Sequence, residues 1–309
     1  MDLHAAGSTA HLLIRTRQDR KALNPAVHPK SQSHYPVILA IANQKGGVGK
    51  TTTAVNISAI LSRRGLRLLL VDMDPQGNAT SSFGIDKRAL DTTVYDILVG
   101  DYPAADLRIR EVRPHLDLLP ANPSLAGAEV EMVDLDERSY RLRDALDTVT
   151  DDYDLIVIDC PPSLGLLTVN ALCAATRVVV PIQCEYLALE GLGQLIATID
   201  LVKRSLNPDL DVAGVLMTMY DVRTRLSAHV VEEVRRFFPR RMFQTIVPRS
   251  IRLAEAPSYG QSIDEYDAGS RGALAYEHFA TELLERLGVQ SPVVLPVAAG
   301  VQSEDVHLS

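Results

Sequence analysis

A run of glycine, lysine and threonine residues between positions 43 and 53 has the composition of a phosphate-binding loop. It reads NQKGGVGKTTT and separates an apolar segment from a segment with helical spacing. Glycines let backbone N–H groups converge on phosphate oxygens, and a helix N-terminus adds positive potential there. In such a loop Lys50 reaches the β- and γ-phosphates of a nucleoside triphosphate, and the Thr51 hydroxyl binds Mg²⁺.

Carboxylates follow two other apolar segments. Asp72 and Asp74 end RLLLVDMD, and Asp159 ends DLIVID. Ligands of open α/β sheets bind at the carboxyl ends of the strands, so these acids are candidate site residues. Asp72 and Asp74 are two positions apart around one apolar residue, and we expect one to face a nucleotide while the other serves the fold. The pattern alone leaves Asp74 equally compatible with a solvated turn, whereas Asp159 is expected to hold Mg²⁺ through a water molecule.

The segments that must position these groups alternate between two kinds of periodicity. Short, continuous apolar runs predict strands that are buried on both faces, and the stretches between them have helical spacing. This alternation predicts an α/β fold with a doubly wound, mostly parallel sheet and helices on both faces. The predicted strands cover 37–42, 67–72, 116–119, 154–159, 177–182, 212–217 and 245–247, and the predicted helices cover 51–63, 142–148, 164–174, 189–205, 227–238 and 273–287.

One domain is expected to account for most of the chain. With 309 residues, of which 46% are hydrophobic, the chain can fill a substantial core. Residues 1–34 lack sustained periodicity and predict a flexible N-terminal extension, although partner binding by this segment stays open. Residues 35–287 show no internal linker, and the proline-containing residues 288–309 predict a flexible C-terminal tail.

Composition excludes several classes of protein. No apolar run has the length of a membrane span or of a signal peptide core. The three cysteines, Cys160, Cys173 and Cys184, form no C-x-x-C pair and lie in apolar stretches, which indicates buried, reduced thiols and a cytoplasmic protein. A formal net charge of −8 argues against nucleic-acid binding by the whole surface and leaves a local basic face to be found.

The phosphate loop departs from the plain Walker A pattern, because Gln44 stands where the first glycine is expected. The run K-G-G-V-G-K-T instead resembles the deviant Walker A motif of P-loop NTPases in the ParA/Soj branch of the ParA/MinD superfamily, the ATPases of chromosome and plasmid partition. The resemblance implies an ATP-sandwich homodimer in which Lys45 reaches the nucleotide of the other protomer, although the residue alone is equally compatible with a solvated loop lysine. The implied nucleotide-binding residues are Lys45, Gly46, Gly47, Val48, Gly49, Lys50, Thr51 and Thr52.

Two further segments are similar to switch regions of the same family. D-x-D-P-Q-G-N at 72–78 resembles switch I, which implies that Asp74 orients the attacking water. The segment ending in Asp159 resembles switch II. Lys45, Lys50 and Asp74 are therefore the expected catalytic residues. They supply positioning and charge stabilisation without a strong base, so hydrolysis of ATP is expected to be slow until a partner completes the site.

The segment from 246 to 260 resembles the I-P-R-N-x-R-L-x-E-A-P-S-x-G motif of partition ATPases. There the proline and the residue two positions later flank adenine, which implies Pro248 and Ser250 here. Ser250 stands where asparagine is usual, so a side-chain contact at this position is less secure than a backbone contact.

A basic face lies between Leu201 and Arg252, where ten Lys or Arg residues outnumber five acids. Such a patch can bind DNA phosphates without reading sequence, although ordinary solvated helix faces have a similar composition. In the resembling family, arginines that match Arg223 and Arg252 form a DNA-binding surface in the ATP dimer.

The favoured function is a partition ATPase that binds nonspecific double-stranded DNA in its ATP state on the nucleoid and is stimulated by a ParB-like, centromere-binding protein. The alternative is a membrane-surface ATPase resembling MinD, which requires a basic amphipathic C-terminal helix. Residues 292–309 contain no Lys or Arg, so no membrane partner is expected. The lack of C-x-x-C disfavours an iron–sulfur carrier, and relatives in secretion or cellulose synthesis share the same ATPase core.

Overall fold

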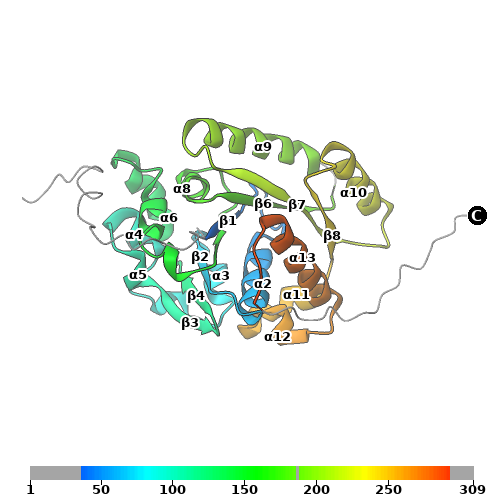
Figure 1. The fold of residues 1–309 in the computed structure, drawn as a ribbon, viewed down its shortest axis with the longest axis horizontal. Coiled ribbons are helices and arrows are strands. Elements are labelled where there is room, and N and C mark those ends of the chain that lie inside the picture. Colours follow the sequence, from blue (N-terminus) through cyan, green and yellow to red (C-terminus); the bar gives the residue numbers. More distant parts are fainter. Residues whose placement is uncertain (1–35, 186–187, 293–309) are drawn as a thin grey trace, which may run out of the picture. The chain divides into compact units, whose positions relative to one another are not determined.

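The computed structural model describes residues 36–185 and 188–292, and the side chains of 186–190 are outside the description (Figure 1). Eight strands form one sheet in the order β3-β4-β2-β5-β1-β6-β7-β8. All neighbouring strands are parallel except β3 and β4. The strands are β1 Val37–Ile41, β2 Leu68–Asp72, β3 Ile109–Arg113, β4 Leu116–Leu119, β5 Leu155–Asp159, β6 Arg177–Gln183, β7 Asp211–Tyr220 and β8 Met242–Pro248.

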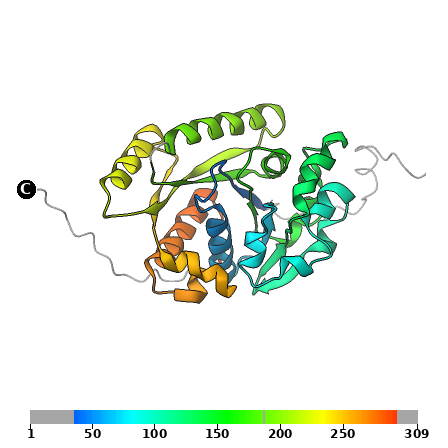
Figure 2. The same ribbon diagram turned by 180° about the vertical axis from the view of Figure 1, so that it is seen from behind.

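Helices cover both faces of the sheet, as Figures 1 and 2 show from opposite sides. The α-helices are α2 Lys50–Arg63, α3 Asn78–Ser81, α4 Val94–Gly100, α5 Ala104–Leu107, α6 Leu125–Glu131, α7 Arg141–Leu146, α8 Leu166–Ala174, α9 Ala188–Ser205, α10 Arg225–Phe237, α11 Ile251–Glu255, α12 Ile263–Asp267 and α13 Arg271–Leu287. Short 3₁₀ segments lie at η1 Lys87–Ala89, η2 Met132–Asp134, η3 Thr150–Asp152 and η4 Ala256–Tyr259.

Successive residues of each central strand enter different cores because side chains alternate across a sheet. In β1, Ile38 and Ala40 join the core under α4, α6, α7, α8, α9 and α10, while Leu39 and Ile41 join the core under α2 and α13. Strands buried on both faces must be apolar throughout, which is why β1, β2 and β5 read as continuous aliphatic runs.

The register of the central strands places the candidate site at one edge. Ile41 at the end of β1 pairs with Asp159 at the end of β5, and Asp72 at the end of β2 also pairs with Asp159. The phosphate loop leaves β1 at this level and enters α2. The loop and the acids are therefore neighbours although they are up to about a hundred residues apart in the chain.

The sheet and its two helical layers confirm the predicted fold class, and each predicted strand is present within a few residues of its expected bounds. Strand β3 and the short helices α3 to α6 were not predicted from the sequence, because they lack a clear period. The C-terminal tail was expected to begin at residue 288, but Val289 is buried in the core and the Ser291 hydroxyl donates to the Arg64 carbonyl at 3.1 Å. Residues 288–292 thus belong to the fold.

The predicted N-terminal extension 1–34 and the tail beyond residue 292 lie outside the described residues. None of the helices within 36–185 and 188–292 combines the length and apolar character needed to cross a membrane.

Candidate nucleotide-binding site

The loop between β1 and α2 has the backbone conformation of an anion cradle. Gly47 and Gly49 have φ angles of 73° and 89°, in the left-handed region that favours glycine. An added Cβ at Gly47 meets no atom within 4 Å, so backbone conformation and not crowding requires glycine here. Gly49 precedes α2 and no side chain caps the helix. The first N–H groups of a 14-residue helix are therefore available to phosphate oxygens.

Lys50 lies inside this loop. Its side chain is buried, and Nζ donates to the Lys45 carbonyl at 3.1 Å. Burial lowers the pKa of Lys50, and the negative charges of Asp159 and Asp74 oppose that shift. A buried ammonium group near carboxylates is suited to bind a polyanion such as a triphosphate.

Lys45, the second loop lysine, points to the surface. Its Nζ forms an ion pair with Glu185 Oε2 at 3.1 Å, and both side chains are about half exposed. The preceding residue ties the same part of the loop to α9, because Gln44 Nε2 donates to Gln194 Oε1 at 3.0 Å. The two lysines thus occupy different environments: Lys50 faces the interior of the loop, and Lys45 is exposed at its rim.

Asp159 is a fully buried carboxylate, and neither of its oxygens has a hydrogen-bond partner among the described residues. Burial raises its pKa well above the usual range and the nearby Asp72 raises it further, whereas the Thr51 side chain and Lys50 lower it. A buried, unsatisfied carboxylate next to a threonine hydroxyl is a donor set that suits Mg²⁺. Among the described residues, no group of three His, Cys, Asp or Glu side chains is placed to hold a metal by itself.

The two acids after β2 differ in their hydrogen bonds. Asp72 Oδ2 accepts from the backbone N–H and the hydroxyl of Thr80, at 2.8 and 2.7 Å. Asp72 therefore anchors α3, and its burial raises its pKa to about 6. Asp74 Oδ1 accepts only from the Gln76 N–H, at 2.9 Å, within the described residues. Asp74 acts electrostatically on both Lys50 and Asp159, so the structure brings these three predicted site residues together.

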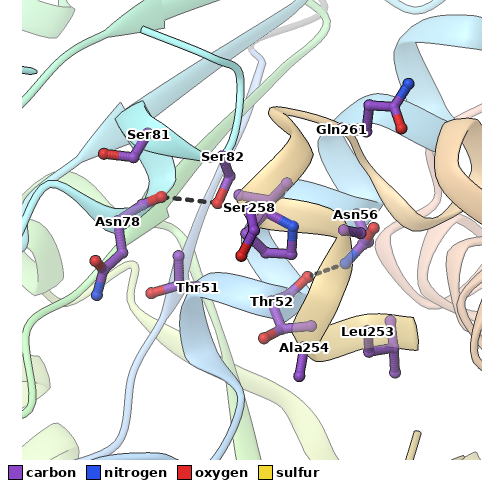
Figure 3. Close-up of a pocket in the computed structure, with 13 residues that line it drawn as sticks. Thr51, Thr52, Asn56, Asn78, Ser81, Ser82, Leu253, Ala254, Ser258 and Gln261 are labelled. Carbon is purple, nitrogen blue, oxygen red and sulfur yellow. Dashed lines mark hydrogen bonds between the residues drawn. The ribbon is translucent and has the colours of Figure 1, made fainter. Parts of the chain in front are cut away.

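A cavity of about 360 Å³ opens beside the start of α2 (Figure 3). Its size lies in the range of small-molecule sites, which begins at roughly 300 Å³. The hydroxyl and amide groups on its wall carry no formal charge. The lining residues are Thr51, Thr52, Val55, Asn56, Asn78, Ser81, Ser82, Leu253, Ala254, Ala256, Pro257, Ser258 and Gln261. Pro248 and Ser250 are not among them; Pro248 ends β8, and Ser250 lies directly before α11.

Comparisons with known proteins identify the family of this chain. A sequence model of the AAA domain family matches residues 37–212. The chromosome partitioning protein ParA of Myxococcus xanthus is 53% identical over 255 residues, which cover 82% of this chain and 90% of that protein. The sporulation initiation inhibitor protein Soj of Bacillus subtilis is 54% identical over 246 residues, with coverages of 80% and 97%. The chain belongs to the ParA/Soj family of partitioning ATPases.

A solved structure is also similar to this ParA/Soj family member. The crystal structure of a Mycobacterium smegmatis protein named cobyrinic acid a,c-diamide synthase, with a bound ATP analogue and magnesium, is 41% identical. Its TM-score is 0.73, and the match covers 84% of this chain and 100% of that one. The likeness extends the family assignment from sequence to the whole P-loop fold.

The two arginines singled out for DNA are on the surface of this ParA/Soj chain, and each has a local carboxylate partner. Arg223 Nη2 lies 2.7 Å from Asp221 Oδ2, and Arg252 Nη1 lies 3.2 Å from Glu255 Oε2. These arginines follow β7 and β8, the two strands at one side of the sheet. The ion pairs orient the guanidinium groups and leave the Arg223 side chain 84% exposed.

Sequence reasoning missed three residues around the phosphate loop. Thr218 donates its hydroxyl to the Val48 carbonyl at 2.9 Å, and Met219 next to it has a strained φ of 53°. Glu185 is the partner of Lys45. None of them lies in a glycine-rich or acid-rich motif, so only the pairing of distant segments could reveal them.

Proposed function

We propose that this chain is an ATP-dependent dimerising switch that binds nonspecific DNA in its ATP state and hydrolyses ATP slowly during chromosome or plasmid segregation. The observation that carries the proposal is the pair of loop lysines, one buried and one exposed at the rim. A buried Lys50 serves the nucleotide of its own protomer, whereas an exposed Lys45 can extend toward a second protomer once its surface ion pair with Glu185 opens. Residues 35–287 are proposed as the ATPase domain, continuing to residue 292.

In the proposed ATP complex, the loop residues 45–52 bind the triphosphate and the adjoining cavity receives the nucleoside. Asn78, Ser258 and Gln261 line that cavity and offer polar groups to a ribose or a purine. Pro248 and Ser250 are proposed to flank the base from the segment just before α11. Thr51 and Asp159 are proposed to hold Mg²⁺, which when bound neutralises charge on the phosphate oxygens.

Hydrolysis in this proposal depends on positioning and not on a strong base. Asp74 orients the attacking water, since only one described N–H group occupies its carboxylate. Lys50, and Lys45 from the other protomer, stabilise the charge that develops on the transferred phosphoryl group. Slow turnover then makes the ATP state long-lived until a ParB-like protein stimulates cleavage.

DNA binding is proposed for Arg223 and Arg252, because guanidinium groups on the surface bind phosphates without reading base sequence. Their surface positions near the ends of β7 and β8 put them on the same side of the sheet as the nucleotide loop. Pairing two protomers at that side would double the number of arginines offered to one duplex.

Calorimetry with ATP and Mg²⁺ tests the nucleotide assignment. Lys50→Ala is expected to lose detectable binding, because no other described cation lies inside the loop. Asp74→Ala is the matched control: it should retain ATP binding and, since cleavage stops, accumulate as a dimer on size exclusion. Retained affinity in Lys50→Ala, or a purely monomeric Asp74→Ala protein with ATP, contradicts the proposal.

The diamide synthase name of the Mycobacterium smegmatis protein raises a second candidate, amide formation from a carboxylate with ATP. Releasing ammonia from glutamine for such a reaction commonly uses a reactive thiolate. All three cysteines of this chain are buried, and burial raises the pKa of Cys173 to about 11 and of Cys184 to about 12. These thiols are poor nucleophiles, which favours the partition ATPase.

The membrane-surface alternative is tested by offering anionic vesicles beside DNA in each nucleotide state.

A further inference from the structure

Four arginines gather where α10 ends and β8 begins. Arg235, Arg236, Arg240 and Arg241 lie within seven positions, and we call them the α10 corner. The turn between them is compact, because the Phe238 N–H donates to the Val234 carbonyl at 2.8 Å and the Arg241 N–H to the Phe238 carbonyl at 3.0 Å. All four side chains are exposed. A short, hydrogen-bonded turn therefore holds four cations in one small area.

The α10 corner differs from the other basic positions of this region in how many unpaired cations it gathers: Arg204, Arg225 and Arg249 also form no ion pair with a described residue, but they are scattered along the chain. Lys203, Arg223 and Arg252 each form an ion pair with a nearby carboxylate. None of the four corner arginines forms an ion pair with any residue the structure describes. Their charge is not compensated within the described protein, so it is available to an external anion.

The surroundings of the α10 corner keep it cationic. Arg286 of α13 supports the turn from beneath: its Nη1 donates to the Arg241 carbonyl at 3.1 Å, and its guanidinium stacks on the Phe243 ring at 3.9 Å. Glu282 is paired with Arg286 and with two backbone N–H groups of β8. The carboxylates on the preceding turn are Glu232 and Glu233, of which Glu233 faces His229 at 3.7 Å.

The α10 corner is remote from the nucleotide loop. It adjoins the first residue of β8, whereas the phosphate loop and Arg223 lie beyond the carboxyl ends of the strands. Helix α10 has 13 residues and separates Arg223 from the corner by about 20 Å, the rise of roughly six base pairs along a DNA strand. The corner therefore lies at the opposite end of the parallel strands from the loop that is proposed to bind the nucleotide.

We propose that the α10 corner is a second contact surface for the phosphates of duplex DNA, and that it acts in every nucleotide state. This inference rests on the proposed DNA-binding function and adds a surface to it. The corner supplies a weak, constant affinity, and the ATP dimer adds the contacts of Arg223 and Arg252. Phosphate recognition fits the corner because guanidinium groups without carboxylate partners bind phosphate oxygens through paired N–H groups, and such backbone contacts occur at any sequence.

The test measures anisotropy of a labelled duplex of mixed sequence against salt, without nucleotide, with ADP and with ATP. Replacing all four corner arginines with alanine is expected to abolish the nucleotide-independent binding. In the ATP state this replacement should make the negative slope of log K against log salt shallower by roughly 2 to 4, since each lost phosphate contact removes about 0.9 from its magnitude. The matching lysine replacement keeps the charge and should keep the slope, which separates charge from folding.

Two control variants show whether a change in DNA binding comes from the α10 corner. Arg88→Ala with Arg110→Ala removes two exposed arginines near the other side of the sheet and should leave the slope unchanged. Arg223→Ala with Arg252→Ala should remove only the ATP-dependent gain. An unchanged slope in the alanine corner variant overturns the inference while leaving the proposed function intact, whereas wild-type protein that binds no DNA in any state overturns the proposed function itself.

Phe237 provides a second discriminating variant. Its ring is 62% exposed next to the α10 corner, and exposed aromatic rings stack on unpaired bases. Duplex affinity is expected to fall less than about threefold in Phe237→Ala. Preferential binding of single strands that is lost in Phe237→Ala would overturn the duplex assignment, as would corner-dependent capture of anionic vesicles that exceeds capture of DNA.

Discussion

At the scale of single residues, the acid beside the phosphate loop that lacks hydrogen-bond partners among the described residues is Asp159, and a bound cation would offset its charge. Asp159 is buried with two unpartnered oxygens, and its pKa is raised because its charge is poorly solvated. Both oxygens of the neighbouring Asp72 accept hydrogen bonds, from Thr80 and from the Asp74 backbone N–H. The buried, unpartnered charge of Asp159 thus destabilises the folded chain at the position proposed for Mg²⁺. Such a charge is typical of a site that binds a ligand and not of a group that stabilises the fold.

Asp159→Asn should therefore stabilise the free protein and weaken its response to ligand. Removing the buried charge is expected to raise the free energy of unfolding at pH 7.5 by about 1–2 kcal/mol. The same change should remove most of the stabilisation that ATP with Mg²⁺ gives the wild type. Thermal melts with and without the ligand measure both effects, and lower stability of the free variant would contradict the assignment.

The ion pair between Lys45 and Glu185 predicts a second single-residue effect. Glu185→Gln frees the Lys45 side chain in both protomers, so ATP-dependent dimerisation is expected to strengthen by roughly 2- to 30-fold, since each exposed ion pair contributes roughly 0.2–1 kcal/mol and two are removed. Asp211→Asn breaks the similarly exposed pair with Lys203 and is the control. Sedimentation at several protein concentrations with ATP gives the constants; equal dimerisation of the three proteins would show that the pair has no influence.

At the scale of elements, helix α3 connects two regions. One end is bonded to Asp72 beside the proposed nucleotide site, and the turn after the other end packs against the segment that follows α11. Asp72 bonds to Thr80 within α3. The turn after α3 reaches Gly84, and a Cβ added at Gly260 would lie 2.8 Å from the Gly84 Cα. Backbone therefore packs against backbone between the turn that follows α3 and the segment that follows α11.

Gly260→Ala should disturb this junction. Gly260 has a φ of 66° and no room for a Cβ, whereas Gly288 has a φ of 67° and nothing within 4 Å. Gly288→Ala thus carries the backbone strain without the clash, and is expected to cost about 1 kcal/mol in unfolding free energy. Gly260→Ala should cost about 1–3 kcal/mol more. Denaturant unfolding measures the difference, and equal costs would mean that the junction is not tight.

The strands that are easiest to predict from the sequence are those whose composition is set by burial on both faces of the sheet. Buried parallel strands must be aliphatic throughout, so β1, β2 and β5 stand out, and glycine-rich chemistry identifies the loop after β1. Strand β3 is partly exposed and carries charged residues at three of its five positions without alternation, and its pairing with β4 is fixed by tertiary contacts. The sequence likewise identified Lys45 but not Glu185, because the partner is fixed by the packing of β6 against β1 and not by a motif.

At the scale of the whole molecule, the buried acids couple protonation to stability. Asp72 has a pKa of about 6 in the folded chain against 3.8 for the free residue. Between these values the folded state holds a proton that the unfolded state has released, so stability falls as pH rises through this window. Asp159 shifts in the same direction.

Comparison of the wild type with Asp72→Asn between pH 4 and pH 6.5 isolates this contribution. The difference in unfolding free energy is expected to change with pH by up to about 1.4 kcal/mol per unit, with the wild type losing stability relative to the variant as pH rises. Chemical denaturation at four pH values provides the measurement. Parallel curves for the two proteins would place the folded pKa of Asp72 at its ordinary value.

The three buried cysteines have a practical consequence for following this molecule. Their burial keeps the thiol form dominant at neutral pH, and thiolate is the species that attacks maleimides. A cysteine introduced at an exposed site such as Arg88 will consequently react alone, without removal of the native ones. Two populations that carry different dyes at this surface site can test the proposed dimerisation by energy transfer between protomers, while the native core stays unaltered.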